Sequence, residues 1–198
     1  MMTLPIALTS SRLVLSPLFF LAFFVPIWTG SLEAASVVML WIIFIAVEVT
    51  DYADGAVARS RNQISDLGKL MDPFADVISR VTYFLCFSLV GIMPAWVLIV
   101  VFYREFGIIF IRLLMYREGT ALAARRGGKT KALLYFASAG FSLIVLTLER
   151  LEWLVGWHEG LRVFVAIVYV GAAVMAIVSF VDYLRVFRMR SSAGDVES

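Results

Sequence analysis

Five aspartates lie within one short stretch of the sequence, which reads DYADGAVARSRNQISDLGKLMDPFAD from Asp51 to Asp76. The flanking residues are strongly apolar, and a carboxylate in or beside an apolar segment is costly unless it has a function. Four of these aspartates form two pairs, Asp51 with Asp54 and Asp72 with Asp76. The fifth, Asp66, lies in the polar middle of the stretch, where an aspartate commonly caps a helix.

The spacing within each pair places both carboxylates on one helical face. Asp51 and Asp54 are three residues apart at the end of an apolar segment, and Asp72 and Asp76 are four residues apart at the start of the next. Because the connection between the segments is short, the two faces can converge. Four converging carboxylates repel one another unless cations lie between them, and hard oxygen ligands in that number suit Mg²⁺ or Mn²⁺. Two such ions can clamp a diphosphate during an in-line displacement.

Small and basic residues follow Asp51 on the same helix. Gly55 and Ala58 share its face, so a flat or bulky ligand could approach the backbone there, and Arg59 adds a positive charge suited to a phosphate. A structural alternative stays open for each single residue, since small residues also mark helix packing in membranes and Asp72 could be a helix cap. Four carboxylates together with glycine and arginine indicate a ligand site more strongly than any member alone.

A second group of charged residues lies further along the chain. Arg104 and Arg112 stand eight residues apart within an apolar segment, roughly on one side of the expected helix, and Lys129 and Lys131 lie at the start of the next one. Such a cluster suits an acceptor molecule that itself carries a phosphate. Two simpler roles stay open, because Glu105 could neutralise either arginine and the lysines could serve only to orient the protein in a membrane.

The composition limits the class of protein. The chain has 198 residues, of which 62% are hydrophobic and 16% charged, with a net charge of +2. This balance is far from that of a soluble protein and too weakly basic to indicate nucleic-acid binding. The single cysteine, Cys86, provides no disulfide framework. We therefore expect one integral membrane domain.

Apolar runs long enough to cross a bilayer predict an all-α fold with six transmembrane helices. Glycine and proline punctuate the chain between them, and Pro73 is expected in the first turn of the third helix. We expect residues 1–190 to form a single catalytic domain, followed by a short polar tail at 191–198. The six segments are residues 8–28, 34–53, 73–91, 94–116, 130–148 and 161–184.

The distribution of basic residues predicts the orientation. The connections after the second and fourth segments and the C-terminal tail carry most of the connecting arginines and lysines, whereas the other connections hold only Arg150. The positive-inside rule then places both termini in the cytoplasm and the aspartates at the cytoplasmic face of an inner or plasma membrane. Tryptophans at the opposite ends of the segments agree, as an aromatic belt would: Trp28, Trp96, Trp153 and Trp157.

The aspartate stretch resembles the signature of the CDP-alcohol phosphatidyltransferases, in the spacing Asp51-x2-Asp54-Gly55-x2-Ala58-Arg59-x8-Gly68-x3-Asp72-x3-Asp76. The resemblance implies transfer of a phosphatidyl group from CDP-diacylglycerol to a hydroxyl, with release of CMP. It also implies that Asp76 deprotonates the acceptor, and that members often form homodimers. The implied ligands of two Mg²⁺ or Mn²⁺ ions are Asp51, Asp54, Asp72 and Asp76. The implied lining of the CDP-lipid site is Gly55, Ala58, Arg59 and Gly68.

The basic cluster resembles the phosphatidylglycerophosphate synthase branch of that family. The chain departs from the branch at Ile6, where asparagine is common, and at Ala132, where threonine is usual. The branch implies glycerol 3-phosphate as the acceptor, with its phosphate bound by Arg104, Arg112, Lys129 and Lys131. The residues that carry the resemblance are Arg104-Glu105, Arg112, Gly128-Lys129-Thr130-Lys131 and, in the opening LPIALTSSR, Thr9 and Arg12.

Three alternatives remain open. An enzyme of the same family could use another acceptor, such as inositol phosphate or serine. A divalent-cation transporter would also need aspartates near the membrane, although all four carboxylates gather at one membrane face. A scaffold could bind anionic lipid through its basic connections but would not need the aspartates.

Overall fold

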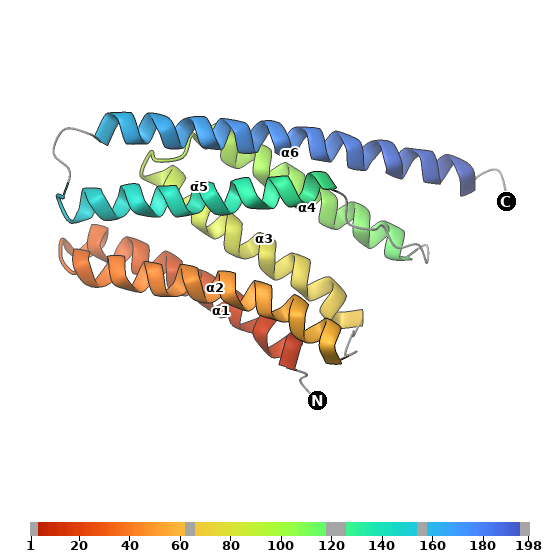
Figure 1. Cartoon of the computed structure of the whole chain (residues 1–198), viewed down its shortest axis with the longest axis horizontal. Helices are drawn as coiled ribbons and strands as arrows, with labels where there is room; N and C mark the ends of the chain where they lie inside the picture. The colour runs from red at the N-terminus through yellow and green to blue at the C-terminus, as the bar shows by residue number, and fades with distance from the viewer. Residues whose placement is uncertain (1–3, 62–65, 118–125, 154–157, 195–198) are drawn as a thin grey trace.

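The computed structural model describes residues 4–61, 66–117, 126–153 and 158–194, and the side chains of residues 7–51, 71–115, 130–153 and 159–189. Within these ranges the chain forms six α-helices and no strand (Figure 1). The all-α fold predicted from the apolar segments is confirmed. The helices are α1 Leu4–Thr29, α2 Glu33–Arg61, α3 Asp66–Leu89, α4 Ala95–Arg117, α5 Arg126–Arg150 and α6 His158–Gly194.

Most helices run beyond the apolar segments that predicted them. α2 continues to Arg61 and α3 begins at Asp66. Arg59 and Lys69 therefore lie on helices, although both fall outside the expected transmembrane segments 34–53 and 73–91. α6 continues to Gly194, through half of the expected polar tail. Apolar length marks only the part of a helix that lipid can surround, whereas alanine, arginine, lysine and glutamate sustain helical structure in water as well.

The start of α3 corrects one expectation directly. Pro73 lies inside α3 and not in its first turn. A proline in a helix interior removes one backbone hydrogen bond, which the surrounding helix tolerates here. Asp72 and Asp76 are therefore held by continuous helix on both sides of the proline.

The helices pack as two groups, one of α1, α2 and α3 and the other of α4, α5 and α6, and the two groups contact each other. α1 packs against both α2 and α3, α5 packs against α6, and α4 packs against α3 and α6, while α2 also contacts α5. Tight turns at Gly30 and Gly91, with φ of 65° and 75°, join α1 to α2 and α3 to α4, a conformation that glycine adopts without strain. Figure 1 shows both termini at one end of the molecule, together with the end of α2 and the start of α3.

Aromatic rings fill the centre of the α1, α2 and α3 group. The ring centroid of Phe19 lies 4.5 Å from that of Tyr83 and 6.3 Å from that of Phe87, and Phe44 lies 5.7 Å from Tyr83. Tilted and edge-on pairs at these separations are favourable beyond the area they bury. This packing fixes α1 against α3 over the length that leads to the aspartates.

α4 and α6 approach each other closely at one glycine. A Cβ built on Gly107 of α4 would lie 2.9 Å from the ring of Phe180 on α6. Real Cβ contacts are not that short, so only glycine allows this approach. Small residues permit close helix packing in membranes for the same reason.

The described chain contains four helices that are long and apolar enough to cross a membrane, and it is an integral membrane protein. Large apolar side chains face outward on them, among them Ile42 at 57% and Ile167 at 65% exposure, as lipid contact requires. α3 and α4 do not meet the same measure, because charged side chains interrupt them. The four segments are Ala7–Thr29, Glu33–Asp51, Thr130–Arg150 and Glu159–Met189.

Candidate active site

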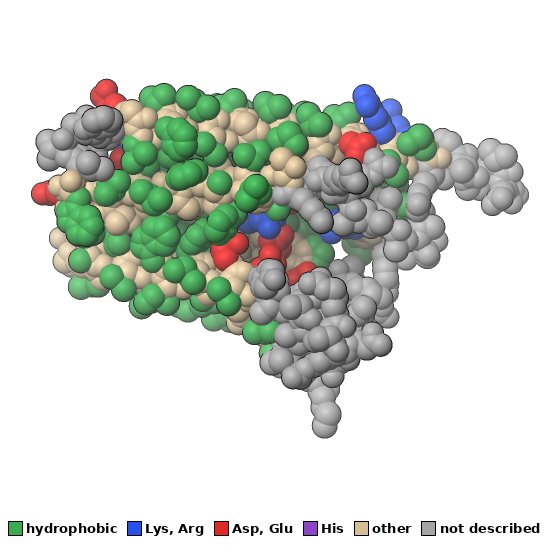
Figure 2. All heavy atoms as spheres, viewed as in Figure 1, with side chains coloured by type: hydrophobic (Ala, Val, Ile, Leu, Met, Phe, Trp, Pro, Cys, Tyr) green, Lys and Arg blue, Asp and Glu red, His purple; other side chains and the backbone are tan. Residues whose placement is uncertain are grey.

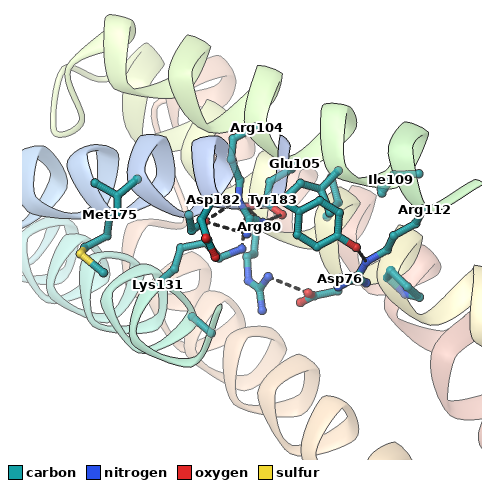
Figure 3. Close-up of a pocket in the computed structure, with 16 residues that line it drawn as sticks. Asp76, Arg80, Arg104, Glu105, Ile109, Arg112, Lys131, Met175, Asp182 and Tyr183 are labelled. Atoms are coloured by element: carbon teal, nitrogen blue, oxygen red, sulfur yellow. Dashed lines mark hydrogen bonds and ion pairs between the residues drawn. The ribbon is translucent and has the colours of Figure 1, made fainter. Parts of the chain in front are cut away.

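A cavity of about 430 Å³ lies between α3, α4, α5 and α6 (Figure 3), within the usual range for small-molecule sites. Figure 2 shows acidic and basic side chains side by side near the middle of a largely hydrophobic face, with other charged side chains toward its ends. Among the side chains that the structure describes, the four basic and three acidic residues that line the cavity leave a formal excess of one positive charge. They are Arg80, Arg104, Arg112 and Lys131, and Asp76, Glu105 and Asp182.

Asp76 lies on the wall of this cavity and pairs with an arginine from its own helix. Nη1 of Arg80 donates to Oδ2 of Asp76 over 2.6 Å, one helical turn away. The side chain of Asp76 is 29% exposed and that of Arg80 is 18% exposed, so the pair is largely withdrawn from bulk solvent. Figure 3 shows the Asp76 carboxylate directed toward Arg80 at the edge of the cavity.

Three charged side chains form a buried network across α4 and α5. Glu105, 4% exposed, accepts from Nη1 of Arg104 at 2.9 Å and from Nζ of Lys131 at 2.6 Å. Arg104 also donates to the hydroxyl of Ser179 on α6 at 3.0 Å, and Lys131 lies 4.5 Å from the ring centroid of Tyr135. Glu105 thus neutralises part of the basic cluster, as the sequence allowed, and one positive charge remains in the network.

Arg112 lines the same cavity two turns further along α4. Its Nε donates to the hydroxyl of Tyr183 on α6 over 3.2 Å, and its guanidinium lies 6.0 Å from the centroid of that ring. The expectation that Arg104 and Arg112 share one side of their helix is confirmed, since both line the cavity and both contact α6.

Asp51 and Asp72 meet at a fourth arginine, Arg12, which comes from α1. Nη1 of Arg12 donates to Oδ1 of Asp51 over 2.6 Å, and Nη2 of Arg12 donates to Oδ1 of Asp72. The Arg12 side chain is 1% exposed, whereas those of Asp51 and Asp72 are 42% and 53% exposed. The convergence expected of the two aspartate faces is therefore built around an arginine of the first helix.

A smaller cavity of about 100 Å³ lies behind Asp51. Glu48, one turn before Asp51, and Arg80 line it together with Tyr83, whose buried hydroxyl has no hydrogen-bond partner in the described structure. Arg80 lines both cavities. This arginine therefore connects the surroundings of Asp51 with those of Asp76.

Several predicted site residues lie in helical segments whose side chains are outside the described residues. The end of α2, the start of α3 and the start of α5 contain them. They are Asp54, Gly55, Ala58, Arg59, Gly68 and Lys129.

The oxygen donors at Asp51 and Asp72 fit Mg²⁺ or Mn²⁺. Magnesium is commonly held by one or two carboxylates, with waters and substrate phosphates completing the shell. Asp51 and Asp72 supply carboxylates from two helices, and about half of each side chain is accessible. Among the side chains that the structure describes, which exclude Asp54, there is no group of three acidic, histidine or cysteine residues placed to hold a metal ion. The described carboxylates therefore fit an ion whose remaining ligands include oxygens of a bound phosphate.

Sequence reasoning assigned no site role to Arg80 or to the wall formed by α6. Arg80 stands four residues after Asp76, a spacing that predicts contact on a helix. Asp182 lines the cavity and lies inside the apolar segment 161–184. A charged residue within such a segment also indicates function. Ser179 and Tyr183 carried no such signal, because their place in the cavity depends on how α6 packs.

The model of the family described as CDP-alcohol phosphatidyltransferase matches residues 2–178. Over 148 residues the chain is 40% identical to the CDP-diacylglycerol–glycerol-3-phosphate 3-phosphatidyltransferase of Treponema pallidum (strain Nichols), covering 74% of this chain and 68% of that protein. It is 32% identical over 177 residues to a probable phosphatidylglycerophosphate synthase of Mycobacterium tuberculosis (strain ATCC 25618 / H37Rv), covering 89% and 78%. It is 34% identical over 137 residues to the CDP-diacylglycerol–glycerol-3-phosphate 3-phosphatidyltransferase of Bacillus subtilis (strain 168), covering 66% and 71%. The protein belongs to the CDP-alcohol phosphatidyltransferase family.

Proposed function

We propose that this protein transfers the phosphatidyl group of CDP-diacylglycerol to a hydroxyl of glycerol 3-phosphate, giving phosphatidylglycerophosphate and CMP. Membership of the family and the names of the relatives support this reaction. The structural observation that carries it is the cavity with an excess of positive charge beside Asp76. Such a cavity suits a small acceptor with a phosphate at one end and a reacting hydroxyl at the other.

The acceptor phosphate is bound by Arg104, Arg112 and Lys131, with Lys129 at the start of α5. Arg104 and Lys131 already share Glu105, and this contact holds both cations in place before the ligand arrives. Hydrogen bonds from charged donors to phosphate oxygens are short and strong, and the arginine fork adds direction. The excess positive charge gives a net attraction for an anionic acceptor over a neutral one.

Asp76 accepts the proton of the attacking hydroxyl. Arg80 holds one carboxylate oxygen of Asp76, which fixes its direction at the cavity wall. The acceptor oxygen forms a bond to the phosphorus of the phosphatidyl group while the bond from that phosphorus to the CMP oxygen breaks. The proton passes to Asp76 and CMP leaves with the electron pair.

The CDP-lipid lies against the C-terminal end of α2 and the N-terminal start of α3, along Gly55, Ala58, Arg59 and Gly68. Asp51, Asp54, Asp72 and Asp76 would hold Mg²⁺ or Mn²⁺, whose charge would stabilise the diphosphate and the leaving oxygen. These positions stand on the spacing of the family signature.

All six helices cross the membrane in this proposal, with both termini and the aspartates on the cytoplasmic side. Both termini lie at the same end of the molecule as the aspartate-bearing ends of α2 and α3, as an even number of antiparallel spans requires (Figure 1). The basic residues at this end support the cytoplasmic assignment.

The test is CMP release by the detergent-purified protein with CDP-diacylglycerol and Mg²⁺. Glycerol 3-phosphate, inositol 1-phosphate, serine and no acceptor are compared in separate reactions. We expect release only with glycerol 3-phosphate. Release with inositol phosphate or serine instead would keep the aspartate site and overturn the acceptor. The elution volume of the same sample in size-exclusion chromatography tests whether the protein forms a homodimer.

An inactive preparation needs a separate check for folding. Circular dichroism and a single elution peak show whether the helices and the fold are intact. Folded protein that releases no CMP with any acceptor, but takes up Mn²⁺ into sealed vesicles, would support a divalent-cation transporter. Omitting Mg²⁺ and then supplying Mn²⁺ measures which ion the reaction uses.

A further inference from the structure

Arg12 is the one described side chain that contacts carboxylates on two different helices at the candidate metal site. One guanidinium nitrogen donates to Asp51 of α2 and the other to Asp72 of α3. Its carrier, α1, packs against both of those helices. The geometry of the two aspartates therefore depends on a residue outside the aspartate stretch.

The electrostatics of this arrangement require all three charges together. A fully buried guanidinium is costly unless anions neutralise it, and the two carboxylates repel each other unless a cation lies between them. The two nitrogens of the planar arginine fork have a fixed separation, so they set the distance between the carboxylate oxygens that they hold. Lysine has the same charge but one nitrogen, and it cannot impose that distance.

The contacts leave room for a metal. Arg12 uses the Oδ1 atom of each aspartate, and about half of each carboxylate side chain is exposed. The second oxygen of each group can therefore bind an ion while the first stays hydrogen-bonded. Hydrogen bonds of this kind to ligating carboxylates commonly orient them for the metal.

We infer that Arg12 is a positioning residue that holds Asp51 and Asp72 at the separation needed to bind a divalent cation. The inference rests on the metal site of the proposed function and adds a residue of α1 to it. Arg12 touches neither substrate nor reacting atoms in this role. It acts through the two aspartates.

A purely structural role for Arg12 predicts that its variants lose stability and not metal affinity. Other contacts hold the same helices together. The hydroxyls of Ser16 and Ser79 lie 2.9 Å apart between α1 and α3, and Ser36 of α2 donates to the carbonyl of Ala22 over 2.6 Å. These contacts do not involve Arg12. Variants at Arg12 are therefore expected to fold.

The experiment measures Mn²⁺ affinity by electron paramagnetic resonance of the full-length protein in detergent, without any substrate. Arg12→Lys and Arg12→Gln are compared with wild type and with Arg150→Lys, a buried arginine at the opposite end. We expect both Arg12 variants to bind Mn²⁺ about 10- to 100-fold more weakly, the usual effect of losing such a contact, and Arg150→Lys to match wild type. Excess Mn²⁺ should restore part of the CMP release of Arg12→Lys.

Two results would overturn the inference. Normal or tighter Mn²⁺ binding by folded Arg12→Lys would show that charge alone matters, or that the arginine competes with the metal. A wild-type protein that binds no Mn²⁺, either alone or in the presence of CDP as a source of diphosphate, would remove the site itself, whatever the catalytic assay gives. If wild type binds Mn²⁺ and releases no CMP, the proposed reaction fails, but the affinities of the variants still decide the role of Arg12.

Discussion

Two buried arginines each join three helices, at opposite ends of the bundle. Arg12 of α1 contacts α2 and α3, and Arg150 of α5 contacts α1 and α2. Their side chains are similarly withdrawn from solvent, at 1% and 7% exposure. The two residues differ in the chemistry of their partners, and only the partners of Arg12 include aspartates of the proposed site.

Arg150 is satisfied mainly by neutral groups. It donates to the hydroxyl of Ser36 and to the backbone carbonyl of Phe23, both over 2.5 Å, and it lies 5.0 Å from the centroid of the Phe23 ring. Its acidic partner, Glu33, is 3.3 Å away and 49% exposed. Neither neutral partner carries a negative charge, so this cluster has no counterpart to the pair of carboxylates that Arg12 contacts.

Arg12, in contrast, is neutralised by two carboxylates that also carry the family signature. The same kind of side chain thus connects helices at both ends, but only at the Arg12 end do its partners have chemistry beyond packing. A buried arginine by itself does not indicate function. The identity and exposure of its partners do.

The largest expected effect comes from comparing one acidic partner at each end. Asp76→Asn removes the proposed base beside Arg80, and CMP release should fall by roughly 10²- to 10⁴-fold with the fold retained. Glu149→Gln is the matched control, since Glu149 pairs with Arg162 at 2.5 Å near the opposite end. It should leave CMP release unchanged. Equal activity losses in the two variants would contradict the division between the ends.

A smaller catalytic effect is expected at Arg104. Arg104→Gln removes a charged donor from the acceptor cavity while Ser179 and Glu105 remain, and a hydrogen bond to a charged group contributes about 1.5–3 kcal/mol. The KM for glycerol 3-phosphate should therefore rise about tenfold or more. The KM for CDP-diacylglycerol should stay the same. Steady-state kinetics with each substrate varied in turn measure both, and Arg188→Gln, on an exposed part of α6, is the control.

Arg150→Met should act on stability and not on turnover. It leaves the Ser36 hydroxyl and the Phe23 carbonyl without a buried donor, which costs about 1–3 kcal/mol. The thermal midpoint in detergent should fall, while CMP release per folded molecule stays as in wild type. A selective loss of turnover at an unchanged midpoint would place function at the Arg150 end of the molecule as well.

The smallest effect is expected from Glu33→Gln. Glu33 is half exposed, and exposed ion pairs contribute at most about 1 kcal/mol. Its thermal midpoint should lie close to that of wild type, well above that of Arg150→Met. A midpoint as low as that of Arg150→Met would show that the ion pair, and not the neutral contacts, holds Arg150.

The helices were predictable from the sequence because apolar length decides where lipid can surround a helix. The polar ends of the helices were not predictable. α2 ends at Arg61 and α6 at Gly194, and no apolar pattern marks these last turns, which backbone hydrogen bonds continue. The shared side of Arg104 and Arg112 followed from the helical period. Their cavity also needed the packing of α6 against α4.

Contacts between distant segments were beyond the sequence. The contact of Arg12 with Asp72 depends on how α1 is rotated against α3, which the pattern of one helix does not specify. Glu105 was foreseen as a neutralising partner because it adjoins Arg104. Its second partner, Lys131, lies on another helix, and only the fold brings the two together.

Gly107 has a consequence for the spacing of α4 and α6 beside the cavity. It lies on α4 between Arg104 and Arg112, and Phe180 lies on α6 between Ser179 and Tyr183, so the glycine sits between the two hydrogen bonds that cross this gap. The thickness of one aromatic ring therefore sets the spacing of the two cavity walls. A methyl group at this position would meet the ring of Phe180, so either the ring or the spacing of α4 and α6 would have to shift. The approach of these two helices beside the cavity thus depends partly on a residue that has no side chain.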